Sequence, residues 1–416
     1  MNFLKKNKNI LTLSILIGFL TLIVGAYVGE DALGGAKYDY LFHEKYIIAF
    51  YQNFFGALRE FGENYEVRNS PVFFMLASLI LKLNIKIEYL KFYNLIIILP
   101  IIIFFVKSLN LKFQNTNITT ITFLSSVIFL SPTLRSLVAW PYPLIYAICF
   151  FLISIFYFLK FQKTNTKKKL KYCLLNILFL ALSAYFTPNF AIFSIFFLFY
   201  FIKNYQLSKE SFLIISINIV LSLPAIYFLI SKDFYLFRHE AEHVISNYSI
   251  YDTLNISNKI VLISSILFFF LIPIIEIKKI KFENFFQFDF LILFFILLNI
   301  YFYNFSSGLG GGFFYHLSNI IFEGPFLLFI VFIFSLLLFR SYGLINFNNI
   351  FLFILLIFYN IQSTIYFKYY DPIIFFIILF LIKFKENLIL EKISKKYFYF
   401  YIFFLIISFG KKFIVY

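Results

Sequence analysis

Seven of the chain's 20 Asp and Glu residues lie within residues 29–70, between a first apolar stretch and a long series of others. Glu30 and Asp31 come directly after the first stretch, and Asp39 follows soon after. An ionised carboxylate within hydrogen-bond reach of a hydroxyl group can take its proton during a transfer reaction. Acids concentrated in one segment beside a span are therefore a candidate active site. The alternative is that they only mark a solvated loop.

A second pattern that could do chemistry runs from Arg238 to His243 and reads Arg-His-Glu-Ala-Glu-His, which contains the His-Glu-x-x-His spacing of zinc proteases. On a helix, this spacing puts His239 and His243 on the same side, as metal binding requires. No third ligand is identifiable nearby, and a loop of about 28 residues is too small for a protease domain. His239 and His243 remain candidate ligands of a divalent metal ion, and no cofactor is predicted with certainty.

The composition predicts that these residues are positioned by helices in a lipid bilayer. Hydrophobic residues make up 62% of the 416 residues and charged residues 13%, and apolar runs recur from end to end. Such a chain is not a soluble globule but an all-α, polytopic integral membrane protein. The net charge of +16 comes from lysines in short linkers, which is a membrane-topology signal and not a nucleic-acid-binding surface. Cys149 and Cys173 lie inside apolar runs, so neither a disulfide framework nor a thiol-ligated metal is predicted.

Candidate membrane spans extend from a first run near residues 10–28 to a last one near 397–409. The first run is long enough to cross and follows three lysines, so we interpret it as a retained anchor with a cytoplasmic N-terminus. We expect about 11 to 13 crossings in a single membrane domain that covers residues 1–416. The other runs lie near residues 71–83, 92–106, 118–131, 143–159, 172–186, 190–202, 211–230, 259–277, 288–305, 319–339, 348–366 and 372–383.

Lysine-rich linkers give the predicted orientation. Six lysines crowd residues 160–171, and such clusters mark the cytoplasmic side of a membrane protein. When the predicted spans are counted along the chain, the other basic linkers also fall on the cytoplasmic side. The segments predicted to face outward are residues 29–70, 231–258, 306–318 and 367–371. All four histidines of the chain fall in these segments: His43, His239, His243 and His316. They are candidates to bind a metal ion or a phosphate, and the alternative is that they are ordinary solvated side chains.

One stretch does not fit this alternation. Four apolar runs lie between Ser70, predicted outside, and Lys160, predicted inside, although an odd number of crossings is required. We attribute the extra run either to the proline-containing region from Ser131 to Pro143 or to one short neighbour that dips without crossing.

The outward segment 29–70 is predicted to contain a helix that lies in the membrane interface. Its apolar side chains recur at helical spacing beside polar ones such as Gln52 and Arg59. The apolar positions are Tyr46, Ile47, Phe50, Phe54 and Leu58.

An acid just beyond the first span, an interfacial helix, and then Arg68-Asn69-Ser70-Pro71 before the second span follow one another in this chain. This order resembles the membrane glycosyltransferases of the C superfamily, the group that contains protein mannosyltransferases and aminoarabinose transferases. The family often has a His-Pro or Pro-Pro pair where this chain has Ser70-Pro71. The resemblance covers the overall architecture and the first quarter of the chain.

The resemblance implies a polyprenyl-phosphate sugar as donor, a glycan, lipid or protein as acceptor, and inverting transfer at the outer face of a bacterial plasma membrane. It maps the family's acidic residue onto Asp31, with Glu30 beside it and Asp39 as a second carboxylate. Lys368-Tyr369-Tyr370-Asp371-Pro372 is similar to a late motif of these enzymes, or else is an interfacial anchor. The candidate substrate-binding residues are Arg68, Arg238, Lys368, Tyr370 and His316.

The alternative function is a polymerase or flippase of lipid-linked envelope glycans. A flippase is expected to carry charges deep inside several spans, whereas most charges of this chain lie at the ends of its apolar runs. A polymerase is harder to separate from a transferase, because it also works at the outer face.

Overall fold

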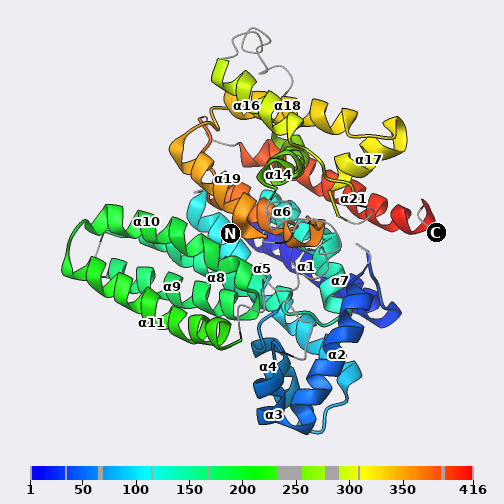
Figure 1. The fold of residues 1–416 in the computed structure, drawn as a ribbon, viewed down its shortest axis with the longest axis vertical. Helices are drawn as coiled ribbons and strands as arrows, with labels where there is room; N and C mark the ends of the chain where they lie inside the picture. Colours follow the sequence, from blue (N-terminus) through cyan, green and yellow to red (C-terminus); the bar gives the residue numbers. More distant parts are fainter. Residues whose placement is uncertain are drawn as a thin grey trace. The chain divides into compact units, whose positions relative to one another are not determined.

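In the part of the chain that the computed structural model describes, every regular element is a helix (Figure 1). This confirms the predicted all-α class. The described residues are 2–32, 35–63, 69–113, 116–165, 168–232, 255–276, 290–307, 310–360, 362, 364–385 and 389–414. Arg68, Arg238, His239 and His243 therefore lie outside the described residues.

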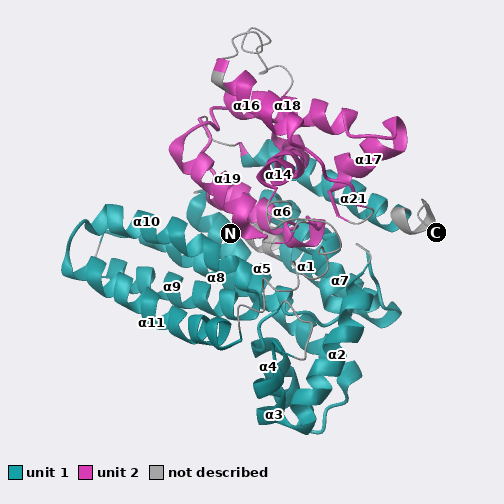
Figure 2. Ribbon diagram, in the orientation of Figure 1, with its two compact units in different colours: residues 1–239, 390–416 teal, residues 240–389 magenta. Residues whose placement is uncertain are grey.

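The chain divides into two compact units (Figure 2). Unit 1 comprises residues 1–239 and 390–416, and unit 2 comprises residues 240–389. The C-terminal helix therefore belongs with the N-terminal half of the sequence. Each unit is described by itself.

Unit 1 contains the first apolar stretch, the acidic segment and most of the long helices. Its helices are α1 (Asn2–Val28), α2 (Ala36–Gln52), α3 (Phe54–Glu60), α4 (Val72–Leu81), η1 (Ile87–Tyr89), α5 (Leu90–Lys112), α6 (Ile118–Leu130), α7 (Pro132–Ala139), α8 (Leu144–Lys163), α9 (Lys168–Phe186), η2 (Pro188–Ile192), α10 (Phe193–Tyr205), α11 (Lys209–Ser231) and α21 (Leu390–Ile414).

Unit 2 is arranged around one buried helix, α14 (Ile256–Leu271), which packs against each of the longer helices that the structure describes in this unit. The other helices of unit 2 are η3 (Ile272–Ile274), α16 (Phe290–Tyr301), α17 (Phe313–Phe322), α18 (Phe326–Ser341), α19 (Phe347–Tyr359), η5 (Phe367–Tyr369) and α20 (Ile373–Phe380).

Seven helical segments in the described residues are long and apolar enough to cross a membrane, and α6 with α7 forms an eighth candidate that bends by 52°. These segments support the multi-pass membrane class predicted from the sequence. Five shorter apolar helices accompany them. The expected 11 to 13 crossings are reached only if shorter helices cross as well.

The predicted run at residues 319–339 is not one helix. The structure has α17 and α18 instead, separated by Glu323, Gly324 and Pro325. Glu323 ends α17 in a left-handed conformation with φ of +51°, and the proline then begins the next helix. Because Glu323 is exposed in this break, it is not an acid enclosed by a continuous helix.

The predicted interfacial helix is also two helices. Asn53 has φ of −144°, and its side chain accepts a hydrogen bond from the Gly56 backbone N–H at 3.0 Å. Asparagine is a favoured N-cap residue, so a new helix starts here. Phe54 and Leu58 therefore belong to α3 and not to the helix that carries Phe50.

In unit 1, α8 is the central helix, with 83% of its most apolar stretch buried, whereas the corresponding stretch of α11 is only 6% buried. Both are strongly apolar. Because an apolar helix surface is stable only where it avoids water, the exposed face of α11 is explained by contact with lipid.

α1 carries a stripe of small residues where α6 packs against it. The hydroxyls of Ser14 and Ser126 lie 3.1 Å apart. One turn further, a Cβ atom on Gly18 would lie 2.4 Å from the Phe129 ring, so only glycine leaves room for this side chain. Small residues of this kind let two membrane helices approach closely.

Helix α4 accounts for the extra apolar run between Ser70 and Lys160, which did not fit the predicted alternation between the two sides of the membrane. It has only ten residues, about 15 Å, which is half of a hydrocarbon core. Asn69, before α4, contacts His43 of α2, and Lys91, after α4, donates to the Ala26 carbonyl at the end of α1. The chain therefore enters α4 and begins α5 at the same end of unit 1, which we call the carboxylate end because Glu30 and Asp31 lie there.

With α4 excluded, α5, α6 and α8 give the odd number of crossings that the alternation requires. α8 starts two residues after Tyr142, which packs against His43 at the carboxylate end. Its 20 residues span about 30 Å, so Lys160 and Lys163 lie at the opposite end of unit 1. Of the two explanations, the structure favours the short neighbour.

Cysteine labelling tests this topology. A membrane-impermeant maleimide is expected to label Lys45→Cys and Lys86→Cys from the same side and Lys163→Cys only from the other side. All three positions are exposed, and the native Cys149 and Cys173 are buried, so the background is expected to be low. Labelling of positions 45 and 86 from opposite sides would show that α4 crosses.

Candidate functional site

The end of α1 is shaped by Gly29, which has φ of +68°. The Glu30 backbone N–H donates to the Gly25 carbonyl at 2.8 Å. A glycine in this conformation followed by this hydrogen bond is a Schellman motif, the common way for a helix to end. The motif reverses the chain and sets Glu30 and Asp31 directly beneath the last turn of α1, in what we call the carboxylate turn.

Asp31 holds the start of α2. Its Oδ1 accepts from the Ala36 backbone N–H at 3.2 Å, and its Oδ2 accepts from that of Lys37 at 3.4 Å. A carboxylate is favoured at a helix N-terminus because the first N–H groups have no partner in the helix and carry partial positive charge. The side chain is 9% exposed, so it is fixed in place and still reaches the surface.

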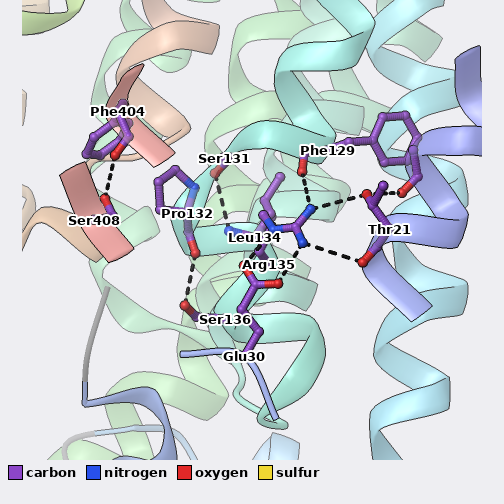
Figure 3. A network of polar contacts seen from close by, with 11 residues as sticks. Thr21, Glu30, Phe129, Ser131, Pro132, Leu134, Arg135, Ser136, Phe404 and Ser408 are labelled. Atoms are coloured by element: carbon purple, nitrogen blue, oxygen red, sulfur yellow. Dashed lines mark hydrogen bonds and ion pairs between the residues drawn. The ribbon is translucent and has the colours of Figure 1, made fainter. Parts of the chain in front are cut away.

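Glu30 forms a two-pronged ion pair with Arg135 of α7 (Figure 3). Nε donates to Oε1 and Nη2 donates to Oε2, each at 2.6 Å. The two side chains are only 5% and 11% exposed. A buried carboxylate needs such a partner, since leaving water costs it several kcal/mol.

The remaining N–H groups of Arg135 are also satisfied. Nη1 donates to the Thr21 hydroxyl and to the Phe129 carbonyl, each at 3.2 Å, and Nη2 donates to the Thr21 carbonyl at 3.4 Å. All five guanidinium donors are therefore used. Arg135 ties the bend between α6 and α7 to the last turns of α1.

The bend that positions Arg135 is encoded locally. Ser131 has an extended conformation, and its hydroxyl accepts from the Leu134 backbone N–H at 3.2 Å. Pro132 occupies the first turn of α7, where its missing N–H is not needed. Serine and then proline thus end α6 and start α7 at an angle of 52°.

Three cationic side chains surround the carboxylate turn. Arg135 pairs with Glu30, Lys91 donates to the Ala26 carbonyl at 3.2 Å, and the Lys37 ammonium lies 5.6 Å from the centre of the Trp140 ring. A site with both signs of charge can stabilise an anionic leaving group while a carboxylate takes a proton.

Polar side chains of α2 and their neighbours lie at the carboxylate end of unit 1. The Asn69 amide donates to His43 Nε2 at 3.2 Å, and the His43 ring packs on Tyr142 with ring centres 4.7 Å apart. Burial, together with the negative charges of Glu44 and Glu88, raises the pKa of Tyr40 far above its usual value. Tyr40 is therefore a neutral hydroxyl at any physiological pH.

The structure places the other predicted residues as follows. Asp39 is part-buried in the first turn of α2, close in sequence to the carboxylate turn. Lys368, Tyr370 and His316 belong to unit 2, whereas the carboxylate turn belongs to unit 1, so they are described separately.

In unit 2, the Lys368 ammonium lies 5.3 Å from the centre of the Tyr366 ring and 5.6 Å from that of Tyr369. Tyr370 is fully buried, and its hydroxyl lies 3.5 Å from the Leu356 carbonyl, so a substrate would not reach it in this conformation. His316 is part-buried within α17 and not in a loop.

The metal prediction rests on His239 and His243, which lie outside the described part of the chain. Among the described residues, no group of three or more His, Cys, Asp or Glu side chains is arranged to hold a metal ion. The divalent ion stays a prediction.

The sequence analysis did not assign a role to Arg135, although the signal was present. Arg135 is the only charged residue between Lys112 and Lys160, a stretch of predicted spans. A charge in such a stretch generally has a partner and a purpose, so a search for an acid at the end of another span would have led to Glu30.

Gly25 tests the packing of this ion pair. A Cβ atom on Gly25 would lie 2.4 Å from Glu30 Oε2, which Arg135 holds in place. Gly25→Ala is therefore expected to destabilise the protein by about 1 to 3 kcal/mol, measured as a lower thermal midpoint in detergent. Gly410→Ala in α21 is the control, since no atom of the described residues lies within 4 Å of its Cβ position and alanine favours a helix. Equal midpoints for the two variants would contradict the packing described.

The helices and their composition define the class of protein as a multi-pass, all-α membrane protein. Comparisons of the chain with protein-family models, with curated proteins and with solved structures give no match. The function is argued from the site.

Proposed function

We propose that this protein is an integral membrane glycosyltransferase that moves a sugar from a polyprenyl-phosphate donor to an acceptor hydroxyl. The observation that carries the proposal is the carboxylate turn. Asp31 is fixed by two backbone N–H groups at the end of a span-length helix, with Lys37 and Lys91 nearby. Such a position suits a donor whose tail lies in the bilayer and whose phosphate lies at its surface.

The reaction follows from the groups present. The acceptor oxygen forms a bond to the anomeric carbon of the sugar while the bond from that carbon to the phosphate oxygen breaks. The acceptor's proton passes to Asp31, whose oxygens each accept one backbone N–H and keep a further lone pair. The lipid leaves as a phosphate anion, which Lys37 and Lys91 are placed to stabilise.

Glu30 and Arg135 have a different role in this proposal. Both oxygens of Glu30 accept from Arg135 at 2.6 Å, so Glu30 is less suited than Asp31 to take a proton. The pair fixes the turn that precedes Asp31, and Arg135 is thus a positioning residue. Asp39 remains the second proposed carboxylate, because it lies in the first turn of the helix that Asp31 holds.

We further propose that the carboxylate end faces outward from a bacterial plasma membrane. The supporting observation is that Lys160 and Lys163 lie at the opposite end of unit 1, because lysine clusters mark the cytoplasmic side. The acceptor is then a glycan, lipid or protein that is reached from outside.

Incubation of the purified protein with labelled polyprenyl-phosphate sugars and a membrane extract tests the proposal. Transfer of one sugar per acceptor, with release of polyprenyl phosphate, is the expected result. Extension of a lipid-linked oligosaccharide would instead favour a polymerase, and movement of the lipid across the bilayer without chemistry would favour a flippase.

A further inference from the structure

Trp140 is the only tryptophan in the chain, and it lies against the carboxylate turn. It follows α7 and is succeeded by Pro141, Tyr142 and Pro143. A Cβ atom on Gly29 would lie 3.1 Å from the six-membered part of the indole ring. Gly29 is thus required for the close approach of this ring as well as for the end of α1.

The contacts that the described residues make with the face of the Trp140 ring are weak. The Tyr40 ring lies 5.8 Å from it at an angle of 48°, and the Lys37 ammonium lies 5.6 Å from its centre. Trp140 is part-exposed and Lys37 is exposed. A cation near the surface is held only weakly by an aromatic ring, so Lys37 can leave the ring for a better partner.

Among the described residues, the indole N–H also has no hydrogen-bond partner, although it is buried. A buried donor without an acceptor destabilises the protein, and an oxygen atom of a ligand would remove this cost after a small movement of the ring. An indole that only anchored the protein in the membrane interface would direct this N–H to water or headgroups.

We propose that Trp140 and Lys37 bind the sugar-phosphate headgroup of the donor. The C–H face of the sugar ring packs on the indole, and the Lys37 ammonium moves from the ring to the phosphate. Aromatic faces carry partial negative charge and attract such C–H groups, while an ammonium is a common partner for phosphate. This inference deepens the proposed function and rests on it, because the headgroup would then lie next to Asp31.

The single tryptophan provides a direct test in the native protein. Its fluorescence is followed, with excitation where tyrosine does not absorb, while three probes are added to the protein in detergent. The probes are farnesyl phosphoryl-mannose, farnesyl phosphate and methyl mannoside, and sugar transfer is measured on the same samples. Farnesyl phosphoryl-glucose and farnesyl phosphoryl-arabinose replace the first probe in parallel titrations.

A saturable change in fluorescence with at least one sugar-bearing lipid, and a smaller one with farnesyl phosphate, is the expected result. Trp140→Phe keeps a ring but loses the N–H, and is expected to weaken the apparent affinity measured by turnover about tenfold. Lys37→Gln keeps the indole, so fluorescence still reports binding, with an affinity weaker by a similar factor. The matched control is Lys45→Gln. Like Lys37, Lys45 is exposed and its ammonium lies over an aromatic ring, here a ring of α2. The control is expected to change neither the fluorescence titration nor the affinity measured by turnover.

The outcomes separate the two proposals. Turnover without any fluorescence change would overturn the role of Trp140 and leave the transferase intact. Equal changes with farnesyl phosphate and with its sugar-bearing forms would also overturn it, since the sugar would not be read. A sugar-dependent change without turnover would support the binding site and count against transfer. Neither signal with any probe would contradict both.

Discussion

Asp31→Asn is expected to lower sugar transfer by about 10²- to 10⁴-fold, the contribution typical of a general base. Asparagine keeps an oxygen that can accept from the Ala36 backbone N–H, so α2 is expected to keep its start. It cannot take a proton from the acceptor. The measurement is turnover of a labelled polyprenyl-phosphate sugar by equal amounts of folded wild-type and variant protein.

The control for this variant is Glu63→Gln. Glu63 is another carboxylate of the acidic segment; it pairs with Lys232 at 2.8 Å, and its side chain is 56% exposed. Its turnover is expected to stay within about twofold of the wild type, because an ion pair whose carboxylate is exposed to solvent contributes little. Undiminished turnover in Asp31→Asn would remove Asp31 from the mechanism.

Arg135→Met is expected to have the largest effect on stability, a loss of about 3 to 5 kcal/mol. The reason is that Glu30, whose side chain is 5% exposed, would be left as a buried charge without its partner. The double variant Glu30→Met, Arg135→Met removes both charges and is expected to recover most of the loss, since an apolar pair of similar size is often equally stable. Thermal midpoints in detergent compare both variants with the wild type.

The pair of Glu63 and Lys232, in which the carboxylate is 56% exposed, provides the comparison. Glu63→Gln, Lys232→Met and their combination are expected to give a coupling energy of about 0 to 1 kcal/mol. If Arg135→Met were no more harmful than Lys232→Met, or if the Glu30 and Arg135 double variant were no better than the single one, the ion pair would not hold α1 to α7.

Helix positions were predictable because apolar runs and their interruptions are local features. The sequence places runs near 143–159 and 211–230, and α8 and α11 cover them with a few residues added at the ends. The break at Glu323 was not predicted, although Gly324 and Pro325 are adjacent, because the surrounding apolar residues masked it. The start of α3 depends on the Asn53 cap, which a hydrophobic pattern does not reveal.

The site was predictable only in part. Asp31 and Glu30 were found because seven of the chain's 20 acids lie within residues 29–70, and these two come directly after the first apolar run. The two have different partners, however: Asp31 accepts from the backbone of α2, whereas Glu30 accepts from Arg135, which is 105 residues away in sequence. Long-range pairing of this kind depends on the fold, so sequence spacing alone could not distinguish the two acids.

The central claim is that the carboxylate turn meets a lipid-phosphate sugar at the membrane surface. The most direct measurement is photo-crosslinking in proteoliposomes with a polyprenyl-phosphate sugar that carries a diazirine on its first isoprene unit, followed by mapping of the labelled peptides. The account predicts label in residues 28–40 and 132–143, reduced by excess unlabelled donor. Donor-sensitive label confined to α9, α10 and α11, with none at the carboxylate turn, would contradict it.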